Sequence, residues 1–312
     1  MLIKDFTEGL TITDFYLIQD IQLKNTAGGK PYLSAKLADK SGTIDMKVWD
    51  YVGNLTSADN GNIIKIQGTV SSYRGNLQFT GNQIRLATEA DTYDLNRLVP
   101  CTPIDMLNTP SEFEMSFSCI ADPDYRNICN TFWKKYKEQF IKFPAAKGVH
   151  HAFIGGLLMH TYNMLKVAGT IAVIYKNEVN HDLLLTGTFL HDIAKIQEYT
   201  QSELGLATGF TFDGQMLGHL VMGAYEVGHV CDELNVPAVK KGMLQNMLLS
   251  HHGKPEYGAA NVPRTLEAEL LYLIDMIDSR VEICRELFEK TEVGTFTEKC
   301  FALDNKQIFR HM

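Results

Sequence analysis

The chain has 312 residues, of which 45% are hydrophobic and 21% are charged, so it is long enough for two folded domains and lacks the composition of a disordered protein. Its formal net charge of −8 argues against a function that depends on a broadly basic surface. Its six cysteines include no C-x-x-C pair, which argues against both a disulfide framework and a zinc ribbon.

The start of the chain, "MLIKDFTEGL", lacks the basic flank and apolar run of a signal peptide. No uninterrupted apolar stretch approaches the length of a membrane span. We therefore expect a soluble, cytoplasmic protein without a membrane partner. The acidity is uneven, because residues 1–99 hold 10 Lys/Arg against 11 Asp/Glu and leave 19 against 26 for the remainder.

The first third of the chain, from Asp14 to about Leu86, predicts five short strands. In "PYLSAKL" and "TIDMKVWD" apolar and polar residues alternate, as they do in half-buried strands. The stretch "FYLIQDIQL" precedes these two strands, and "NIIKIQGTV" and "NLQFTGNQI" follow them. Five short strands with turns marked by glycine are typical of a small closed barrel. We predict an all-β barrel of the oligonucleotide-binding (OB) fold over residues 1–99.

After Pro100 the pattern changes to a helical period. Residues 100–122 are expected to form a linker, and residues 123–312 an all-α bundle. The candidate helices of this bundle cover 123–141, 152–176, 181–198, 215–234, 237–251 and 265–290. The predicted fold is therefore multidomain, with an N-terminal barrel followed by a helical domain.

Histidines and aspartates recur on these predicted helices, each within apolar sequence. A single histidine on an apolar face is usually a satisfied core residue. Buried imidazoles and carboxylates are nevertheless costly unless they are paired or bound to metal, so a series of them is better explained as ligands that converge inside a bundle. The candidate metal ligands are His160, His191, Asp192, His219, His251, His252 and Asp275.

Nitrogen and oxygen ligands without a thiolate suit two divalent metal ions, with Mn²⁺ or Fe²⁺ preferred and Mg²⁺ or Zn²⁺ as alternatives. Two such ions polarise a phosphoryl group and lower the pKa of a water molecule. Asp192 is the candidate bridge between them, because an aspartate can bind two ions. Lys195, one helical turn beyond His191, is expected either to contact a phosphate oxygen or to lie exposed on the helix surface. Asp192 and Lys195 are thus the candidate catalytic residues.

The ordered set resembles the HD-domain metal-dependent phosphohydrolases. His160, His191, Asp192 and Asp275 match the pattern H…HD…D, and the further histidines resemble the H…HD…H…HH…D variant that holds two metals. The segments "HHAFIGGLLMHT" and "HDIAK" agree with this resemblance. The choice between His251 and His252 as inner ligand stays open, and Asp278 is the alternative to Asp275.

Further residues are candidates for substrate contacts. His150 and His151 match a doubled histidine of the HD family, with a capping or surface role as the alternative. Arg280 is expected either to reach a phosphate or to form a surface salt bridge. Together with Lys195 they make the predicted substrate-binding set.

The barrel and the HD pattern together resemble the YhaM-like 3′-5′ exoribonucleases over almost the full chain. The resemblance implies that the barrel holds single-stranded RNA, with single-stranded DNA as an alternative, and that nucleoside monophosphates are released. The candidate nucleic-acid-binding residues, on the outward faces of the second and third strands, are Tyr32, Lys36, Lys47 and Trp49. Tyr16, Tyr73 and Arg74 are expected to extend that surface, unless these aromatics pack against a neighbouring domain.

Two other functions fit parts of this pattern. The first is a phosphohydrolase of small nucleotides or cyclic dinucleotides, which needs the same metals. The second is a non-catalytic single-strand-binding protein with a structural metal. Structural zinc sites are usually rich in cysteine, which favours a catalytic site here. The sequence leaves the oligomeric state open.

Overall fold

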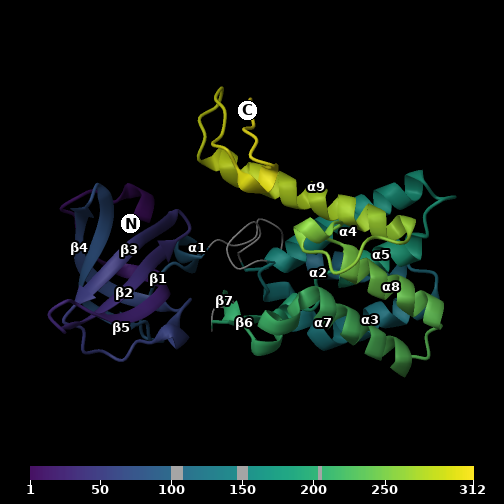
Figure 1. The fold of residues 1–312 in the computed structure, drawn as a ribbon, viewed down its shortest axis with the longest axis horizontal. Coiled ribbons are helices and arrows are strands. Elements are labelled where there is room, and N and C mark those ends of the chain that lie inside the picture. Colours follow the sequence, from purple (N-terminus) through teal and green to yellow (C-terminus); the bar gives the residue numbers. More distant parts are fainter. Residues whose placement is uncertain (100–107, 146–153, 203–205) are drawn as a thin grey trace. The chain divides into compact units, whose positions relative to one another are not determined.

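The computed structural model describes residues 1–99, 108–145, 154–202 and 206–312, which form two compact units (Figure 1). One unit comprises Met1–Cys101 and Gln201–Thr208, and the other comprises Thr102–Thr200 and Gly209–Met312. We call them the barrel unit and the helical unit. The multidomain architecture predicted from the sequence is thereby confirmed.

The barrel unit contains a closed five-stranded sheet in the order β1-β2-β3-β5-β4. β3 and β5 pair in parallel, the other pairs are antiparallel, and the barrel closes between β1 and β4. The five predicted strands and the OB-type barrel are confirmed. The strands are β1 Thr11–Asn25, β2 Pro31–Asp39, β3 Gly42–Trp49, β4 Ile63–Tyr73 and β5 Asn76–Leu86.

The barrel closes around the apolar residues that alternate along its strands. Leu33 and Leu37 of β2 and Met46 of β3 are fully buried. Gly68 lies where the register between β4 and β5 shifts, and a Cβ atom there would lie 2.1 Å from the carbonyl oxygen of Thr80. Only glycine permits this close approach of the two strands. The alternation leaves the polar residues of β2 and β3 on the outer face.

The helical unit is a bundle of helices around one apolar core. Its longer helices match the predicted ranges closely, and their N-termini are capped where the sequence offers a side chain: Asn180 accepts a hydrogen bond from the Leu183 N–H, and Thr265 one from that of Ala268. The helices are α2 Thr109–Ser118, α3 Pro123–Lys142, α4 Gly156–Ile174, α5 His181–Leu190, α6 Lys195–Glu198, α7 Phe212–Glu233, α8 Ala238–Ser250 and α9 Leu266–Glu289. Shorter elements are η1 Ile3–Asp5, η2 Ser57–Asp59, α1 Leu95–Leu98, β6 Tyr199–Gln201, β7 Ala207–Phe210, η3 Pro255–Tyr257 and η4 Phe301–Leu303.

Two expected boundaries differ from the structure. The expected linker 100–122 contains α2, whose Phe113 and Phe117 are buried one helical turn apart in the helical core. The helical unit therefore begins before residue 123, because these two rings need a partner surface. The expected helix 181–198 is interrupted by turns over 191–194, between α5 and α6.

Helix α4 is long and apolar enough to cross a membrane, by length and composition alone. Half of that stretch is buried inside the helical unit, and His160 interrupts its apolar surface. Such burial is what the core helix of a globular domain shows. Its apolar character therefore serves packing, and it places one histidine in the centre of the unit.

Candidate metal centre

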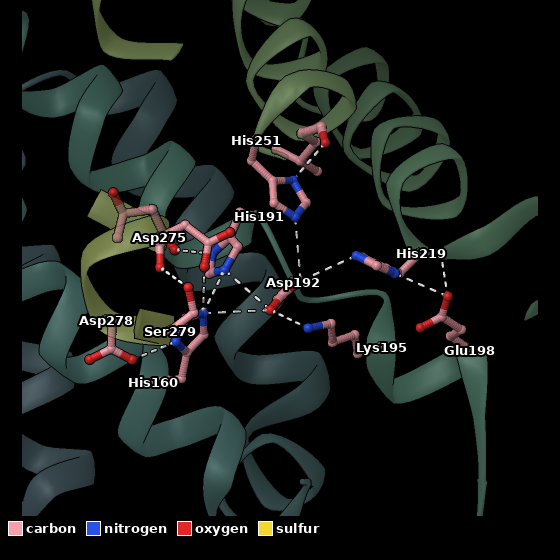
Figure 2. Close-up of polar contacts among 12 residues, drawn as sticks. His160, His191, Asp192, Lys195, Glu198, His219, His251, Asp275, Asp278 and Ser279 are labelled. Atoms are coloured by element: carbon pink, nitrogen blue, oxygen red, sulfur yellow. Dashed lines mark hydrogen bonds and ion pairs between the residues drawn. The ribbon is translucent and has the colours of Figure 1, made fainter. Parts of the chain in front are cut away.

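All seven candidate ligands converge inside the helical unit, although they come from five different helices or their ends. Figure 2 shows these residues apart from His252. The carriers are α4, the end of α5 with the turn after it, α7, the end of α8, and α9. His252 and Asp275 are partly buried, and the other five are buried. The structure thus brings together the residues that the sequence singles out.

The ligands form two groups with one aspartate between them. The candidate donor atoms of His160, His191 and Asp275 lie within 4.8 Å of one another, and so do those of His219, His251 and His252. We call these groups site A and site B. They are joined by the carboxylate of the remaining candidate ligand.

Asp192 faces both sites. Its Oδ2 lies 3.2 Å from Nε2 of His191 in site A. Its Oδ1 lies 3.4 Å from Nε2 of His219 and 3.6 Å from Nε2 of His251 in site B. Each carboxylate oxygen is thus turned toward a different site, as expected of an aspartate shared by two metal ions.

Several buried polar atoms at site B have no hydrogen-bond partner in the part of the chain that the structure describes. A buried polar atom without a partner costs about 1–3 kcal/mol. A divalent cation would satisfy these atoms together, so the residues present fit a metal ion. The atoms are Oδ1 of Asp192, Nε2 of His219, Nε2 of His251 and Nδ1 of His252.

Four of the histidines are oriented by a second contact. In each of them Nδ1 faces an oxygen acceptor, so Nδ1 carries the proton and Nε2 is left to bind a metal, the arrangement common at metal centres. The contacts are His160 Nδ1 to Asp278 Oδ2 at 2.7 Å, His191 Nδ1 to the Thr188 carbonyl at 2.8 Å, His219 Nδ1 to Glu198 Oε1 at 3.0 Å and His251 Nδ1 to the Leu248 carbonyl at 2.8 Å.

The structure gives the two neighbouring aspartates of α9 different positions. Asp275 Oδ1 lies 3.4 Å from Nε2 of His160, on the side of the centre. Asp278 instead accepts hydrogen bonds from Nδ1 of His160 and from the side-chain amide of Asn163. The geometry favours Asp275 as the ligand and Asp278 as the residue that orients His160.

The electrostatics suit a cation. Burial alone would lower the pKa of His160, but hydrogen bonds to the carboxylates of Asp275 and Asp278 raise it to about 10. Burial would raise the pKa of Asp192, yet the charges of Lys195 and His191 hold it well below its usual range. The carboxylates of Asp192 and Asp275 are therefore ionised at neutral pH, and a metal ion bound at site A would take the place of the proton that they hold on His160.

His252 has the opposite environment. Burial, together with the neighbouring His251 and His219, lowers its pKa to about 3. Its imidazole is therefore neutral at pH 7, the form that binds metal. His251 and His252 thus both belong to site B. The geometry does not make one of them the inner ligand in preference to the other.

Lys195 is the first residue of α6, and its Nζ lies 2.7 Å from Oδ2 of Asp192. Its side chain is 15% exposed, so the alternative of an exposed surface lysine is wrong. The turn after α5 directs this cation back toward the centre, where it is held by the carboxylate between the two sites.

The remaining substrate-binding candidates divide into two cases. His150 and His151 lie outside the described residues. Arg280 forms an ion pair with Asp304, with 2.9 Å between Nη2 and Oδ2, as in the salt-bridge alternative. It also lines a cavity of about 800 Å³ that reaches His251, His252 and Asp275.

The barrel candidates are grouped on one face. The rings of Tyr32 and Trp49 are 4.9 Å apart between centroids, and Lys47 Nζ lies 5.4 Å from the centre of the Tyr32 ring. Lys36 forms an exposed ion pair with Asp20, with 2.9 Å between Nζ and Oδ2. The Asp20 carboxylate therefore neutralises the positive charge of Lys36. Trp49 is half exposed, so its ring is open to a ligand.

The expected extension of this face through Tyr16 is wrong. Tyr16 is fully buried, and its hydroxyl donates a hydrogen bond to the carbonyl of Met1. Tyr73 and Arg74 are exposed at the turn between β4 and β5, with the guanidinium 5.4 Å from the Tyr73 ring centre. They stay candidates for contact.

Glu198 is a site residue that sequence reasoning missed. It is buried at the end of α6 and accepts hydrogen bonds from both the backbone N–H and Nδ1 of His219. The only signal in the sequence was a glutamate in "KIQEYT", seven residues after His191, in a stretch that resembles an ordinary amphipathic helix.

Replacing Glu198 with alanine is expected to weaken metal binding at site B by about 10- to 100-fold, because His219 loses the group that orients it. Glu198→Gln keeps an acceptor oxygen and should restore part of the affinity. Calorimetric titration of the metal-free protein with the metal ion measures these affinities. Glu233→Ala, which removes an exposed carboxylate of α7, is the matched control. Equal affinities for Glu198→Ala and Glu233→Ala would contradict the role given to Glu198.

The comparisons with known proteins agree with this geometry. Residues 157–280 match the model of the HD domain, and residues 18–87 match that of an OB-fold nucleic acid binding domain. The chain is 34% identical to a 3′-5′ exoribonuclease YhaM of Listeria monocytogenes serotype 4b over 307 residues, which covers 98% of this chain and 96% of that protein.

A 3′-5′ exoribonuclease YhaM of Oceanobacillus iheyensis is also 34% identical, over 97% of this chain and 95% of its own length. Among solved structures, the second OB-fold domain of replication protein A from Methanococcus maripaludis covers 30% of this chain and 98% of its own, with 16% identity and a TM-score of 0.23. The identity over nearly the full length of the YhaM proteins, with the HD match across the metal centre, decides the family. The chain belongs to the YhaM family of HD-domain proteins.

Proposed function

We propose that the protein is a metal-dependent 3′-5′ exoribonuclease that shortens single-stranded RNA and releases nucleoside monophosphates. The observation that carries the proposal is the placement of Asp192, whose two carboxylate oxygens face two separate groups of histidines. A shared carboxylate between two open His/Asp sites is suited to phosphodiester hydrolysis. The names of its relatives support the direction and the substrate.

The residues of the metal centre have different roles in the proposed reaction. When bound, two divalent ions polarise a phosphoryl group and lower the pKa of a water molecule. His160, His191 and Asp275 would hold one ion, and His219, His251 and His252 the other, with Asp192 between them. Lys195 places a positive charge beside Asp192, where it would stabilise negative charge on the phosphate. We propose Mn²⁺ or Fe²⁺ for both sites, with Mg²⁺ and Zn²⁺ as the alternatives that a metal screen tests.

The proposed RNA contact of the barrel unit is the face of Tyr32, Lys47 and Trp49. Stacking of bases on aromatic rings tolerates any sequence, and a lysine among the rings can meet the backbone. The same face could stack the bases of single-stranded DNA, so the assay compares both. We place the protein in the cytoplasm, where its substrate would be.

The deciding assay incubates the metal-loaded protein with 5′-labelled single-stranded RNA, single-stranded DNA, and a panel of nucleotides that includes cyclic dinucleotides. We expect the RNA to be shortened step by step from its 3′ end, with nucleoside monophosphates as products. Intact RNA beside hydrolysed nucleotides would indicate the small-nucleotide phosphohydrolase instead. Absence of turnover on every substrate and with every metal would indicate a binding protein.

Replacing Trp49 with alanine is expected to weaken single-stranded RNA binding by about 5- to 100-fold, in line with the ~1–3 kcal/mol that stacking of one base contributes. Trp49→Phe keeps an aromatic face and should retain most of the affinity. Fluorescence anisotropy with labelled RNA, measured without metal so that no cleavage occurs, gives the dissociation constants. Unchanged binding in Trp49→Ala would remove this face from the interface.

A further inference from the structure

The segment after α9 lies beyond the residues that match the HD domain. The match to the HD model ends at residue 280, whereas the chain continues beyond Glu289 to residue 312. This C-terminal segment, residues 291–312, turns back on itself, with isolated β-bridges between Phe296 and Phe309 and between Cys300 and Lys306. The short helix η4 lies within this turn and contacts α9.

The C-terminal segment forms one wall of the cavity next to the metal centre. His252 and Asp275 line this cavity from the side of the two sites, and Phe301 and Asp304 line it from the C-terminal segment. Its volume of about 800 Å³ falls within the range of small-molecule binding sites. A molecule in this cavity would therefore lie between the metal ligands and the C-terminal segment.

Three phenylalanine or tyrosine side chains are among the residues that line this cavity. Phe301 is 88% exposed although it lines a cavity, so its ring is hardly covered by protein. Tyr257, 54% exposed, and Tyr272 line it as well. A base stacks on such rings with a gain of ~1–3 kcal/mol. An uncovered phenylalanine beside a phosphohydrolase centre is suited to bind the base of a nucleotide.

Charged residues of both signs line the cavity. Asp304 binds two cations at once, with 2.9 Å to Arg280 and 3.1 Å to Lys306. Arg280 lines the cavity, whereas Lys306 is not among the lining residues. The carboxylates of Glu256, Asp275 and Asp304 line it too, so a phosphate here would also need the metal ions that Asp275 would help to hold. Asp304 and Asn305 both have left-handed backbone conformations, with φ of 56° and 57°, which aspartate and asparagine tolerate better than most residues. This turn holds the carboxylate against Arg280.

We infer that the cavity between α9, η3 and η4 binds the 3′-terminal nucleotide of the substrate, with the base stacked on Phe301 of the C-terminal segment. The inference rests on the proposed exoribonuclease function, and it adds the part of the chain that recognises the terminal base. Because stacking does not read hydrogen-bonding edges, the cavity accepts all four bases. The Arg280 guanidinium in the wall of the cavity contributes to the affinity for the phosphate.

The test compares two ligands that differ by the base alone. Calorimetry measures the binding of adenosine monophosphate and of ribose 5-phosphate to the metal-loaded protein and to Phe301→Ala. We expect the wild-type protein to bind adenosine monophosphate about 10- to 100-fold more tightly than ribose 5-phosphate. Phe301→Ala should lose most of this preference and leave the affinity for ribose 5-phosphate unchanged, since that ligand has no base to stack.

Phe212→Ala is the matched control, because Phe212 is 79% exposed in the same helical unit and is not among the residues that line the cavity. It should bind both ligands as the wild-type protein does. Equal loss of both ligands in Phe301→Ala, or a base preference that survives the substitution, would overturn the inference. A second assay measures kcat/KM for removal of the 3′-terminal nucleotide from RNA. This kcat/KM should fall in Phe301→Ala by the same factor as the affinity for adenosine monophosphate.

The two assays separate the inference from the proposed function. Loss of base preference in Phe301→Ala, together with RNA that the wild-type protein leaves intact, would keep the nucleotide site and reject the exoribonuclease. RNA that is shortened equally fast by Phe301→Ala and by the wild-type protein would keep the exoribonuclease and reject the nucleotide site.

Discussion

Asp192→Asn is expected to reduce phosphodiester hydrolysis by at least about 1,000-fold, since two metal ions supply several kcal/mol of charge stabilisation in the transition state. The asparagine side chain has nearly the same size, so the packing around it should be retained. It replaces one of the two carboxylate oxygens that face sites A and B with an amide NH₂ group, which cannot bind a cation. The initial rate of RNA shortening, measured at saturating metal, checks this.

The metal content separates this explanation from a general loss of structure. Mass spectrometry of the desalted protein should show two ions per chain for the wild type and fewer for Asp192→Asn, with unchanged circular dichroism. Asp232→Asn is the control, because it removes a charge from an aspartate that is 67% exposed and pairs with Lys241. An Asp192→Asn protein that keeps both ions and its full rate would disprove the bridging role.

Much of the fold was predictable because burial leaves a periodic pattern. Leu33, Ala35 and Leu37 alternate with polar residues in the sequence and are buried in the barrel, as a half-buried strand requires. The metal ligands could be found for a related reason. Burying a polar residue such as His160 or Asp192 alone costs free energy, so the occurrence of several of them within apolar sequence indicated that they bind a common ligand.

Sequence periodicity failed to predict burial where contacts with residues distant in the sequence determine it. Tyr16, Leu17 and Ile18 are all buried, although alternation would expose the middle one or its neighbours. Besides its partner strands β4 and β2, β1 is contacted by α1 and η2, so its outer face is covered as well as its inner one. Tyr16 is further covered by Met1 and Arg97.

The division of the ligands into two sites could also not be predicted from the sequence. Spacing along the chain does not say that the Asp192 carboxylate lies between His191 and His219, or that Glu198 turns back to orient the latter. The cavity wall of the C-terminal segment has no periodic pattern at all. Its contacts with α9 include an ion pair between Arg280 and Asp304, 24 residues apart, which no local rule predicts.

The largest expected change in stability comes from the aromatic cluster behind the metal centre. Phe189 is fully buried in α5, and its ring lies 4.7 Å from that of Phe117 and 5.5 Å from that of Phe113 between centroids. It also contacts the rings of Trp133 and Phe140. Phe189→Ala is therefore expected to lower the free energy of unfolding of the helical unit by about 3–5 kcal/mol, through lost burial and the cavity left behind.

Urea unfolding of the metal-free protein, followed by far-ultraviolet circular dichroism, measures this loss without the stabilisation that bound metal would add. Phe189→Leu refills part of the space and should lose less. The exposed Phe212→Ala should stay within about 0.5 kcal/mol of the wild type. Because His191 and Asp192 come two and three residues after Phe189, just past the end of α5, the loss in Phe189→Ala should come with weaker metal binding at both sites. A loss below about 1 kcal/mol would mean that this ring does not anchor the helix that carries the two ligands.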